Sequence, residues 1–550
     1  MELNESENLI LKLVEDGDFS DRAFLKTQRI LSKQNKHQFI TNDILLEAYH
    51  NLINREIIKP NSLLANLLKL KNTRSLSGIV VVSVLTKPFP CPGKCIYCPS
   101  EKDVPKSYLA NEPAVMRALS CHFDPYLQVE ARLKALEAVG HLTDKVNIRI
   151  IGGTWSYYPK SYQTWFVRRI FEAANNQSLK QSEIGLNSPK ELQKVSSLTA
   201  EKTGKRLEEL QLVNETAKHR IVEISVETRQ DYIDLAEIIR LRKLGVTKVE
   251  LGVQSIYDDV LKLNNRGNNT TDTAAATKLL KDAGFKVSYQ MMLNLPGANL
   301  ERDAQMFREL FDDERFKPDH LKIYPLALIK TTPLYQMYER NEYNPYTTEE
   351  LVSLLKSVKS VIPYYCRVER VIRDIPAGEI VEGGAKVSNL RQIVTEKLIA
   401  EGRACHCVRC REIKSEFEAT EGTILFREDY IGSGGKEIFL SYENKSRTKL
   451  YSMLRLRISG NNKSSALLEN AGLIREIHTY GPQVGIGKYS EISAQHQGYG
   501  KKLILEAERI AKEEFDCDKV AVIAGVGVRG YFRKLGYSLV ETYMIKKLKS

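Results

Sequence analysis

Three cysteines that lie within eight residues limit the fold of this sequence more than any other feature: Cys91, Cys95 and Cys98. They follow residues 79–85, a β-branched run that is typical of a buried strand. Prolines and a glycine surround the cysteines, which favours a loop leaving that strand rather than a position in a core. Three thiolates held this close together indicate a metal site.

A 4Fe-4S cluster has four irons and normally takes four cysteine ligands, so a site with three leaves one iron open to a small molecule. The C-x3-C-x2-C spacing, followed by alternating strand and helix patterns, resembles the radical S-adenosylmethionine (SAM) superfamily. In that superfamily the open iron binds SAM, and an electron cleaves SAM to a 5′-deoxyadenosyl radical. The alternatives are a zinc knuckle and three unrelated buried thiols.

Length and composition are those of a multidomain globular protein. A chain of 550 residues predicts three or four domains, and its 42% hydrophobic and 27% charged content is typical of a soluble fold. No run of 18 or more apolar residues occurs, and the acidic start, residues 1–7, is unlike a secretory signal. We therefore expect a cytoplasmic protein with no membrane partner.

Positive charge is concentrated near the N-terminus. The net charge is +12, and residues 22–94 carry twelve Lys or Arg against three acids, Asp43, Glu47 and Glu56. Helical spacing of apolar residues predicts a small basic helical region over residues 1–75. This excess favours a polyanionic partner such as a nucleic acid, whereas a solvated helical face would give the same pattern.

Six of the nine cysteines lie in two triplets, which points to metals in a reducing compartment. The second triplet is Cys405, Cys407 and Cys410, and its tight spacing suits a structural zinc ion, which usually takes four ligands. His406 would have to turn back to be the fourth ligand, so another residue or water is an equal alternative. The remaining three are expected to be ordinary buried thiols: Cys121, Cys366 and Cys517.

From about residue 76 to residue 330, strand and helix patterns alternate, as in parallel β/α folds. After the first strand, the predicted strands are residues 146–151, 221–226, 248–253, 285–292 and 320–325. Two of them end in Gly152-Gly153-Thr154 and in Gln254. Because β/α folds place active sites at the carboxyl ends of strands, a partial barrel would bring these residues to one rim. Residues 175–219 are predicted to hold a loop and a solvated helix.

The C-terminal part predicts a second unit. Strand patterns over residues 450–458 and from Ala466 onward predict antiparallel strands, and Gln495-His-Gln-Gly498-Tyr-Gly500 then opens an amphipathic helix. Glycines at a helix N-terminus leave backbone N–H groups that can bind a pyrophosphate. With the strand and the Tyr531-Phe-Arg-Lys-Leu-Gly-Tyr537 segment that follow, this pattern resembles GNAT acetyltransferases, in which the loop holds the pyrophosphate of acetyl-CoA.

A SAM-radical site and an acetyl-CoA site in one chain resemble the catalytic subunit of Elongator, the tRNA uridine(34) carboxymethylsynthase family that occurs alone in many archaea and bacteria. Matching segments extend over nearly the whole chain, among them Glu112-Pro-Ala-Val-Met-Arg-Ala118, Gly252-Val-Gln-Ser255, Leu321-Lys-Ile-Tyr-Pro325 and Arg533-Lys-Leu-Gly-Tyr537. The resemblance implies an α/β fold, a partial β/α barrel of radical SAM type followed by a GNAT-like mixed α/β domain. The expected division is a basic helical tRNA-binding region (1–75), a radical SAM domain (76–365), a linker with the zinc element (366–414) and an acetyl-CoA-binding domain (415–550).

The resemblance also implies a reaction. The radical would take hydrogen from the acetyl methyl group of acetyl-CoA, the carbon radical would add to C5 of the wobble uridine, and thioester hydrolysis would leave a carboxymethyl group. It implies a tRNA anticodon stem-loop and an electron donor protein as partners, and it allows accessory Elongator subunits. The cluster ligands would be the first cysteine triplet, and the residues near SAM would be Gly152, Gly153, Thr154 and Gln254. The residues implied at acetyl-CoA are Lys145, Glu476, Ile477, His478, Thr479, Gln495, Gly498, Tyr499, Gly500, Lys501 and Phe532. Tyr531 and Lys322 are the implied catalytic residues.

The sequence departs from the family pattern at two positions. Gln230 replaces the proline of a Glu-Thr-Arg-Pro-Asp segment, which is expected to loosen a turn mildly. Phe532 replaces the second tyrosine of Tyr-Tyr-Arg-Lys, so any acid role must fall on Tyr531 or on water. Lys145, outside the acetyl-CoA unit, would otherwise be an ordinary surface lysine.

Two other functions fit the same motifs: a protein lysine acetyltransferase with a structural cluster, and a non-enzymatic tRNA-binding scaffold that senses acetyl-CoA.

Overall fold

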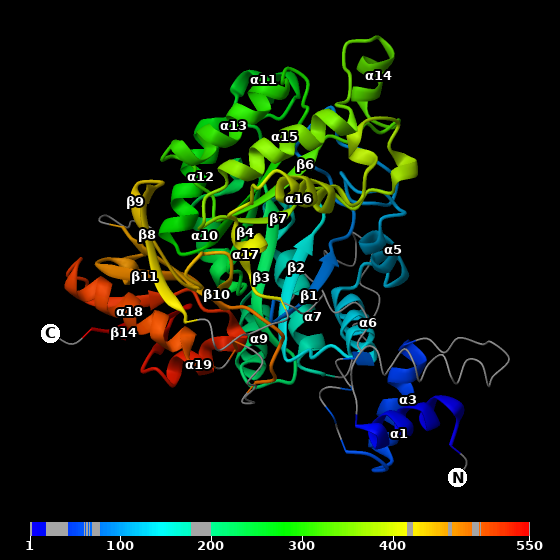
Figure 1. Ribbon diagram of the computed structural model, residues 1–550. Helices are drawn as coiled ribbons and strands as arrows, with labels where there is room; N and C mark the ends of the chain where they lie inside the picture. The colour runs from blue at the N-terminus through cyan, green and yellow to red at the C-terminus, as the bar shows by residue number, and fades with distance from the viewer. Residues whose placement is uncertain are drawn as a thin grey trace.

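The computed structural model describes residues 3–17, 42–59, 61, 64, 67–68, 77–177, 200–414, 422–459, 465–486, 494–495 and 497–548. Two seven-stranded sheets organise these residues, one parallel and one mixed (Figure 1). The predicted fold class is therefore confirmed. The four-part division of the chain stays a prediction.

The first sheet is parallel throughout, and its strands follow one another in chain order. Its strands are β1 (Val80–Leu85), β2 (Lys145–Ile151), β3 (Arg220–Thr228), β4 (Lys248–Gln254), β5 (Lys286–Leu293), β6 (His320–Pro325) and β7 (Arg367–Arg370). This order makes β1 and β7 the two edges and brings all strand carboxyl ends to one rim, as expected of a partial barrel. The six strands predicted in this part of the chain are confirmed.

Helices connect the parallel strands and cover the sheet (Figure 1). They are α5 (Pro113–Ser120), α6 (Pro125–Ala138), α7 (Lys160–Ala174), α9 (Ala200–Asn214), α10 (Leu235–Lys243), α11 (Asp258–Leu263), α12 (Thr270–Asp282), α13 (Leu300–Asp312), α14 (Pro333–Glu339), α15 (Thr348–Val361), α16 (Leu390–Ala400) and α17 (Val408–Arg411). Local sequence sets several starts: α15 begins with a capping box in which Thr347 accepts from Glu350 N and the Glu350 side chain accepts from Thr347 N. The solvated helix predicted within 175–219 corresponds to α9, and residues 178–199 lie outside the described residues.

The second sheet has the order β13-β14-β12-β11-β10-β9-β8, and only β11 and β12 pair in parallel. Its strands are β8 (Ile424–Gly432), β9 (Gly435–Glu443), β10 (Leu450–Ile458), β11 (Ala471–Thr479), β12 (Lys519–Val522), β13 (Ser538–Val540) and β14 (Tyr543–Lys547). The amphipathic helix is confirmed as α18 (Tyr499–Glu513), with Leu503, Ile504 and Ala507 buried. The strand expected from Ala466 starts later, because Ser465 caps a 3-10 turn over residues 466–468.

The N-terminal helices α1 (Glu5–Asp16) and α3 (Asn42–Asn54) pack on each other through a small apolar cluster that includes Leu9, Leu13, Leu45 and Leu52. Much of the predicted basic run lies outside the described residues, at 18–41 and 69–76. In the part of the chain that the structure describes, no helix has the length and apolar character needed to cross a membrane.

Buried arginines of the second sheet bind carboxylates of the first unit. Arg475 on β11 lies 2.6 Å from Asp319, just before β6, and 2.8 Å from Glu437 on β9. Arg457 on β10 lies 2.6 Å from Asp282 at the end of α12. These contacts place the second sheet against the amino-terminal ends of the parallel strands (Figure 1).

Candidate active sites and metal centre

The predicted cluster cysteines and the predicted strand ends share one cavity at the carboxyl rim of the first sheet, here called the cluster cavity. Cys91, Cys95 and Cys98 lie on the loop that follows β1, as expected. The other predicted residues of this site that line it are Gly152, Gly153, Thr154 and Gln254. The structure therefore brings together every residue that the sequence assigned to the cluster and to SAM.

The cysteine loop fits an iron–sulfur cluster by its chemistry and by its space. A hydrogen bond with Cys98 and the positive charge of Arg266 lower the pKa of Cys95 to about 5, and the same hydrogen bond raises the pKa of Cys98, so one of these two thiols is favoured as the thiolate that iron binds. The Arg266 guanidinium lies 3.7 Å from the Cys95 sulfur. A Cβ added at Gly93 would lie 3.6 Å from the sulfurs of both Cys91 and Cys95, so glycine keeps the space between them open.

The strand ends adopt conformations that ordinary side chains rarely take. Gly152 has a φ of +140°, and a Cβ there would lie 2.0 Å from Thr86 Oγ1. Gln254 ends β4 with a φ of 71°, which is uncommon for a residue with a side chain. Such strained conformations persist only where the surrounding structure maintains them, and they occur most often at ligand-binding and active sites. The two positions support the prediction that SAM lies here.

Glu227, at the end of β3, is a central polar group of the cluster cavity. Its carboxylate accepts hydrogen bonds from Tyr108 at 3.1 Å and from Gln290 at 3.0 Å. Sequence reasoning missed Tyr108, Gln290 and Arg266 as lining residues. The sequence could have predicted Gln290, because this polar residue alternates with buried residues along β5. Tyr108 and Arg266 lie on loops, where no spacing rule applies.

Lys322 is not among the residues that line the cluster cavity. Its Nζ lies 3.0 Å from Glu227 Oε1, and it also pairs with Glu250. Burial and the charge of Arg149 lower its pKa, yet these carboxylates outweigh them and the pKa is raised. Lys322 therefore lies behind two residues of the cluster cavity.

Gln230 is better anchored than the sequence suggested. It is 2% exposed, and its side-chain amide donates to Thr273 Oγ1 on α12 at 3.1 Å. The turn expected to loosen without proline is held by this hydrogen bond.

The residues expected at acetyl-CoA line a second cavity of about 490 Å³, here called the acyl cavity. It lies between the second sheet and the amino-terminal ends of β2, β3 and β5. Its predicted lining residues are Lys145, Glu476, Ile477, His478, Thr479, Gln495, Gly498, Tyr499, Gly500, Lys501, Tyr531 and Phe532. The two cavities thus occupy opposite ends of the same parallel strands.

The glycines at the start of α18 shape the acyl cavity. Gly498 precedes the helix with a φ of +84°, a left-handed conformation that favours glycine. A Cβ at Gly500 would lie 3.3 Å from the Tyr531 hydroxyl. The first N–H groups of a helix have no acceptor within it, so this end can bind an anion. Lys145 Nζ donates to Gln495 Oε1 at 2.9 Å, which ties β2 to the loop before α18.

Charged and aromatic groups of the acyl cavity differ in environment. Burial disfavours the charged form of Glu476, yet Lys286, His320 and Arg455 together hold its pKa well below the usual range. Burial raises the pKa of Tyr531, so its hydroxyl keeps its proton at neutral pH. Phe532 is 2% exposed and belongs to the apolar core of the second sheet, so the family's second tyrosine position is used here for packing.

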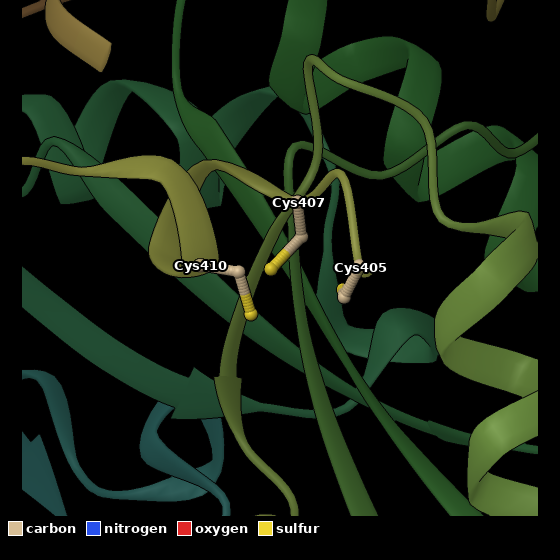
Figure 2. Close-up of side chains that lie close together, drawn as sticks. All are labelled: Cys405, Cys407 and Cys410. Atoms are coloured by element: carbon tan, nitrogen blue, oxygen red, sulfur yellow. The ribbon is translucent and has the colours of Figure 1, made fainter. Parts of the chain in front are cut away.

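The second cysteine triplet forms a metal-ligating group. The ligand atoms of Cys405, Cys407 and Cys410 lie within 4.8 Å of one another, where a loop enters α17 (Figure 2). His406 stacks on Tyr364 with ring centroids 4.7 Å apart, and it is not part of the group. Among the described residues no further Cys, His, Asp or Glu joins the three thiols. The remaining cysteines are buried, as predicted: Cys121, Cys366 and Cys517.

Comparison with known proteins gives the family. Residues 90–310 match the radical SAM superfamily, and residues 318–400 match the radical SAM C-terminal domain. A tRNA uridine(34) acetyltransferase of Methanocaldococcus infernus is 44% identical over 513 residues, which are 90% of this chain and 91% of the relative. Elongator complex protein 3 of Homo sapiens is 36% identical over 88% of this chain and 86% of its own. The chain belongs to the Elongator protein 3 family.

A solved structure supports this membership of the Elongator protein 3 family. The archaeal Methanocaldococcus infernus Elp3 with an N-terminal deletion has a TM-score of 0.72 and 41% sequence identity to this chain. The similarity covers 86% of this chain and 100% of that one.

Proposed function

We propose that this protein carboxymethylates C5 of the wobble uridine, uridine-34, of tRNA, with acetyl-CoA as the source of the two-carbon unit. The observation that carries the proposal is the pair of cavities on one parallel sheet, with three cysteines in one and a glycine-opened helix in the other. Relatives named tRNA uridine(34) acetyltransferase support the choice of substrate.

Cys91, Cys95 and Cys98 would hold the 4Fe-4S cluster, and Gln254 with the glycine pair of β2 would contact SAM. When bound, these cofactors supply a 5′-deoxyadenosyl radical that can take hydrogen from an acetyl methyl group. Arg266 favours the thiolate form of Cys95 and so favours ligation. An electron donor protein would provide the electron.

In the acyl cavity, the N-terminus of α18 would bind the pyrophosphate of acetyl-CoA. Lys145 and the residues 476–479 line the same cavity and would contact the acyl end. We assign the proton donor of thioester hydrolysis to Tyr531, whose hydroxyl lies beside Gly500 in the acyl cavity.

A third cavity supports a polyanionic substrate. It lies beside the cluster cavity, and the two share Tyr108, Glu227, Tyr324 and Arg373 as lining residues. Its charged lining consists of Arg117, Arg132, Arg149, Lys322, Arg370 and Arg373 against Glu112, Glu227 and Asp374. This excess of positive charge, next to the cluster, suits phosphates on either side of an unstacked anticodon base.

The three cysteines of the α17 region would hold a structural zinc ion. The zinc, the electron donor, the accessory subunits and the cytoplasmic location remain parts of the proposal.

The test uses anaerobically reconstituted protein with SAM, a reductant, acetyl-CoA and unmodified tRNA, followed by mass spectrometry of the nucleosides. We expect carboxymethyluridine together with 5′-deoxyadenosine, and loss of both in Cys95→Ala. Cys517→Ala is the matched control, because it removes a buried thiol from the other sheet. Acetylated lysine on an added peptide, without carboxymethyluridine and without consumption of SAM, would instead indicate a protein acetyltransferase.

A further inference from the structure

The inner face of the first sheet carries charged side chains at alternating positions. β4 contributes Lys248 and Glu250, β6 contributes His320 and Lys322, and each of these four is at most 4% exposed. The interior of a β/α barrel is ordinarily filled with branched apolar side chains, and charges are rarely buried unless they are paired. Packing alone therefore does not explain why this sheet carries paired charges on its inner face.

The paired charges start at the acyl cavity, which Glu476 lines. Glu476 Oε2 lies 3.4 Å from His320 Nε2, and His320 Nδ1 lies 2.8 Å from Glu369 Oε1. Lys248 pairs with the same oxygen of Glu369. His320 thus connects a carboxylate of the second sheet with one of the first.

The pairing continues to the cluster cavity. Lys248 Nζ lies 3.4 Å from Glu250 Oε1, and Glu250 also pairs with Lys322. Lys322 Nζ lies 3.0 Å from Glu227 Oε1. Glu227 and Glu250 both line the cluster cavity, so a continuous series of ion pairs and histidine contacts joins the two cavities. We call this series the barrel network: Glu476, His320, Glu369, Lys248, Glu250, Lys322 and Glu227.

The interior around the barrel network has spare hydrogen-bonding capacity. Within the described residues, Ser288 Oγ and Asn147 Oδ1 are buried without a hydrogen-bond partner, and Glu369 Oε2 has the Arg149 guanidinium only at 3.9 Å. Buried polar groups are ordinarily satisfied, so these atoms mark room for water or for a change of partner. Lys248 also lies between two carboxylates, and a shift toward one of them loosens its contact with the other.

We propose that the barrel network couples the two cavities, so that SAM in the cluster cavity tightens the binding of acetyl-CoA in the acyl cavity. This inference rests on the function proposed above. SAM carries a sulfonium and an ammonium group, and positive charge in the cluster cavity draws Glu227 away from Lys322. Lys322 then moves toward Glu250, and Lys248 moves toward Glu369. His320 in turn moves closer to Glu476, so the whole series shifts toward the acyl cavity.

The shift ends at Lys286, which lines the acyl cavity. In the structure Lys286 Nζ lies 3.8 Å from Glu476 and pairs with Glu223. When His320 binds Glu476 more closely, the electrostatic attraction between Glu476 and Lys286 weakens. The Lys286 ammonium can then approach the oxygen of an acyl thioester, which makes the expected coupling positive.

The test measures binding rather than turnover. Cluster-reconstituted protein, without reductant, is titrated with a non-hydrolysable thioether analogue of acetyl-CoA in the absence and presence of saturating SAM. Couplings between sites typically amount to about 5-fold to 150-fold in affinity, and we expect SAM to tighten analogue binding by about fivefold or more. Thermodynamic reciprocity requires the analogue to tighten SAM binding by the same factor.

Two variants interrupt the barrel network without touching either cavity, since neither His320 nor Glu369 lines one. In His320→Gln and in Glu369→Gln we expect each ligand alone to bind within about threefold of wild type, and the reciprocal coupling to fall to about one. His219→Gln is the matched control, because His219 is also buried but lies outside the barrel network. Two variants at different positions guard against a folding defect in one.

Equal analogue affinity with and without SAM in the wild-type protein would overturn the coupling while leaving the proposed function intact. Coupling that persists in both variants would overturn the role of the barrel network. A wild-type holoenzyme that binds SAM but not the analogue would overturn the proposed function, and this inference with it.

Discussion

A single histidine illustrates how the acyl cavity depends on pH. His478 on β11 has its Nε2 2.7 Å from the backbone oxygen of Ser77, a contact in which the ring donates its Nε2–H. Burial lowers the pKa of His478 to about 4, against an ordinary value of 6.5. The unfolded chain therefore takes up a proton below about pH 6.5 that the folded protein takes up only near pH 4.

We predict that His478 lowers the free energy of unfolding as the pH falls from about 6.5 to about 4. In this range His478 gains a proton in the unfolded state but not in the folded state. The full shift corresponds to about 3 kcal/mol. His478→Gln keeps a donor for Ser77 but does not titrate, so its stability should fall less between pH 7 and pH 4. Denaturant unfolding of both proteins at several pH values measures the difference, and equal pH slopes would contradict the assignment.

At the scale of elements, the α17 region depends on its cysteines. Cys405, Cys407 and Cys410 face one another, and Lys359 Nζ lies 3.6 Å from the Cys410 sulfur. Hydrogen bonds within the group lower the pKa of Cys410 and raise the pKa of Cys405, so one thiolate is favoured before a metal binds. Zinc takes thiolate ligands, so its binding would displace the remaining thiol protons.

We predict that Cys407→Ser loses most of the bound zinc while the cluster iron stays, because the two triplets belong to different loops. Elemental analysis of zinc and iron per chain measures both. Cys366→Ser is the matched control, since Cys366 is as deeply buried but is not part of the group. If zinc content were unchanged in Cys407→Ser, the zinc assignment would be wrong.

The contact between the 3-10 turn at residues 526–528 and β3 leaves no space for a side chain. A Cβ at Gly525 would lie 2.0 Å from the backbone oxygen of Val222. We predict that Gly525→Ala destabilises the protein by about 3 kcal/mol and weakens acetyl-CoA binding, because the turn also lines the acyl cavity. Gly530→Ala, at a helical position with nothing within 4 Å, should be neutral or slightly stabilising. Thermal unfolding and ligand titration of both variants check this, and equal behaviour would contradict it.

Sequence reasoning succeeded where a local pattern fixes a local structure. The cysteine loop after β1, the parallel strands and the helix that Gly498 opens all follow from spacing and turn chemistry. It failed for Ala466, where a serine cap makes a turn, and it missed Arg266 and Tyr108, whose loops no periodic pattern describes. Lys322 was assigned to catalysis by resemblance, and its pairing with Glu227 joins β6 to β3, two strands that are not neighbours in the sheet and are distant in sequence.

At the scale of the whole molecule, the relation of the two sheets was beyond sequence reasoning. Arg455 and Arg457 alternate with apolar residues on β10, a pattern that ordinarily indicates one solvated face. In the structure both are at most 1% exposed, as is Arg475 on β11. Their carboxylate partners in the first unit, Asp319 and Asp282, are distant in sequence, so only the folded chain reveals that these arginines fix the acyl cavity beneath the parallel sheet.

The last prediction concerns this interface. Arg475 binds Asp319 of the first unit and Glu437 of the second, and all three side chains are at most 1% exposed. Arg475→Leu leaves two buried carboxylates without their shared cation, so we expect a loss of about 3–5 kcal/mol in stability. The acyl cavity should lose affinity for acetyl-CoA as well, because Arg475 lines it and holds β11 against the first sheet.

The matched control is Arg509→Leu, which removes an arginine from an equally dense group of carboxylates on the exposed face of α18. Arg509 contacts Glu506, Glu513 and Glu514, but its side chain is 42% exposed. Solvated ion pairs contribute little, so this variant should lose far less stability than Arg475→Leu. Denaturant unfolding and limited proteolysis compare the two. Similar losses in both variants would mean that burial at the interface does not determine how the two sheets are held together.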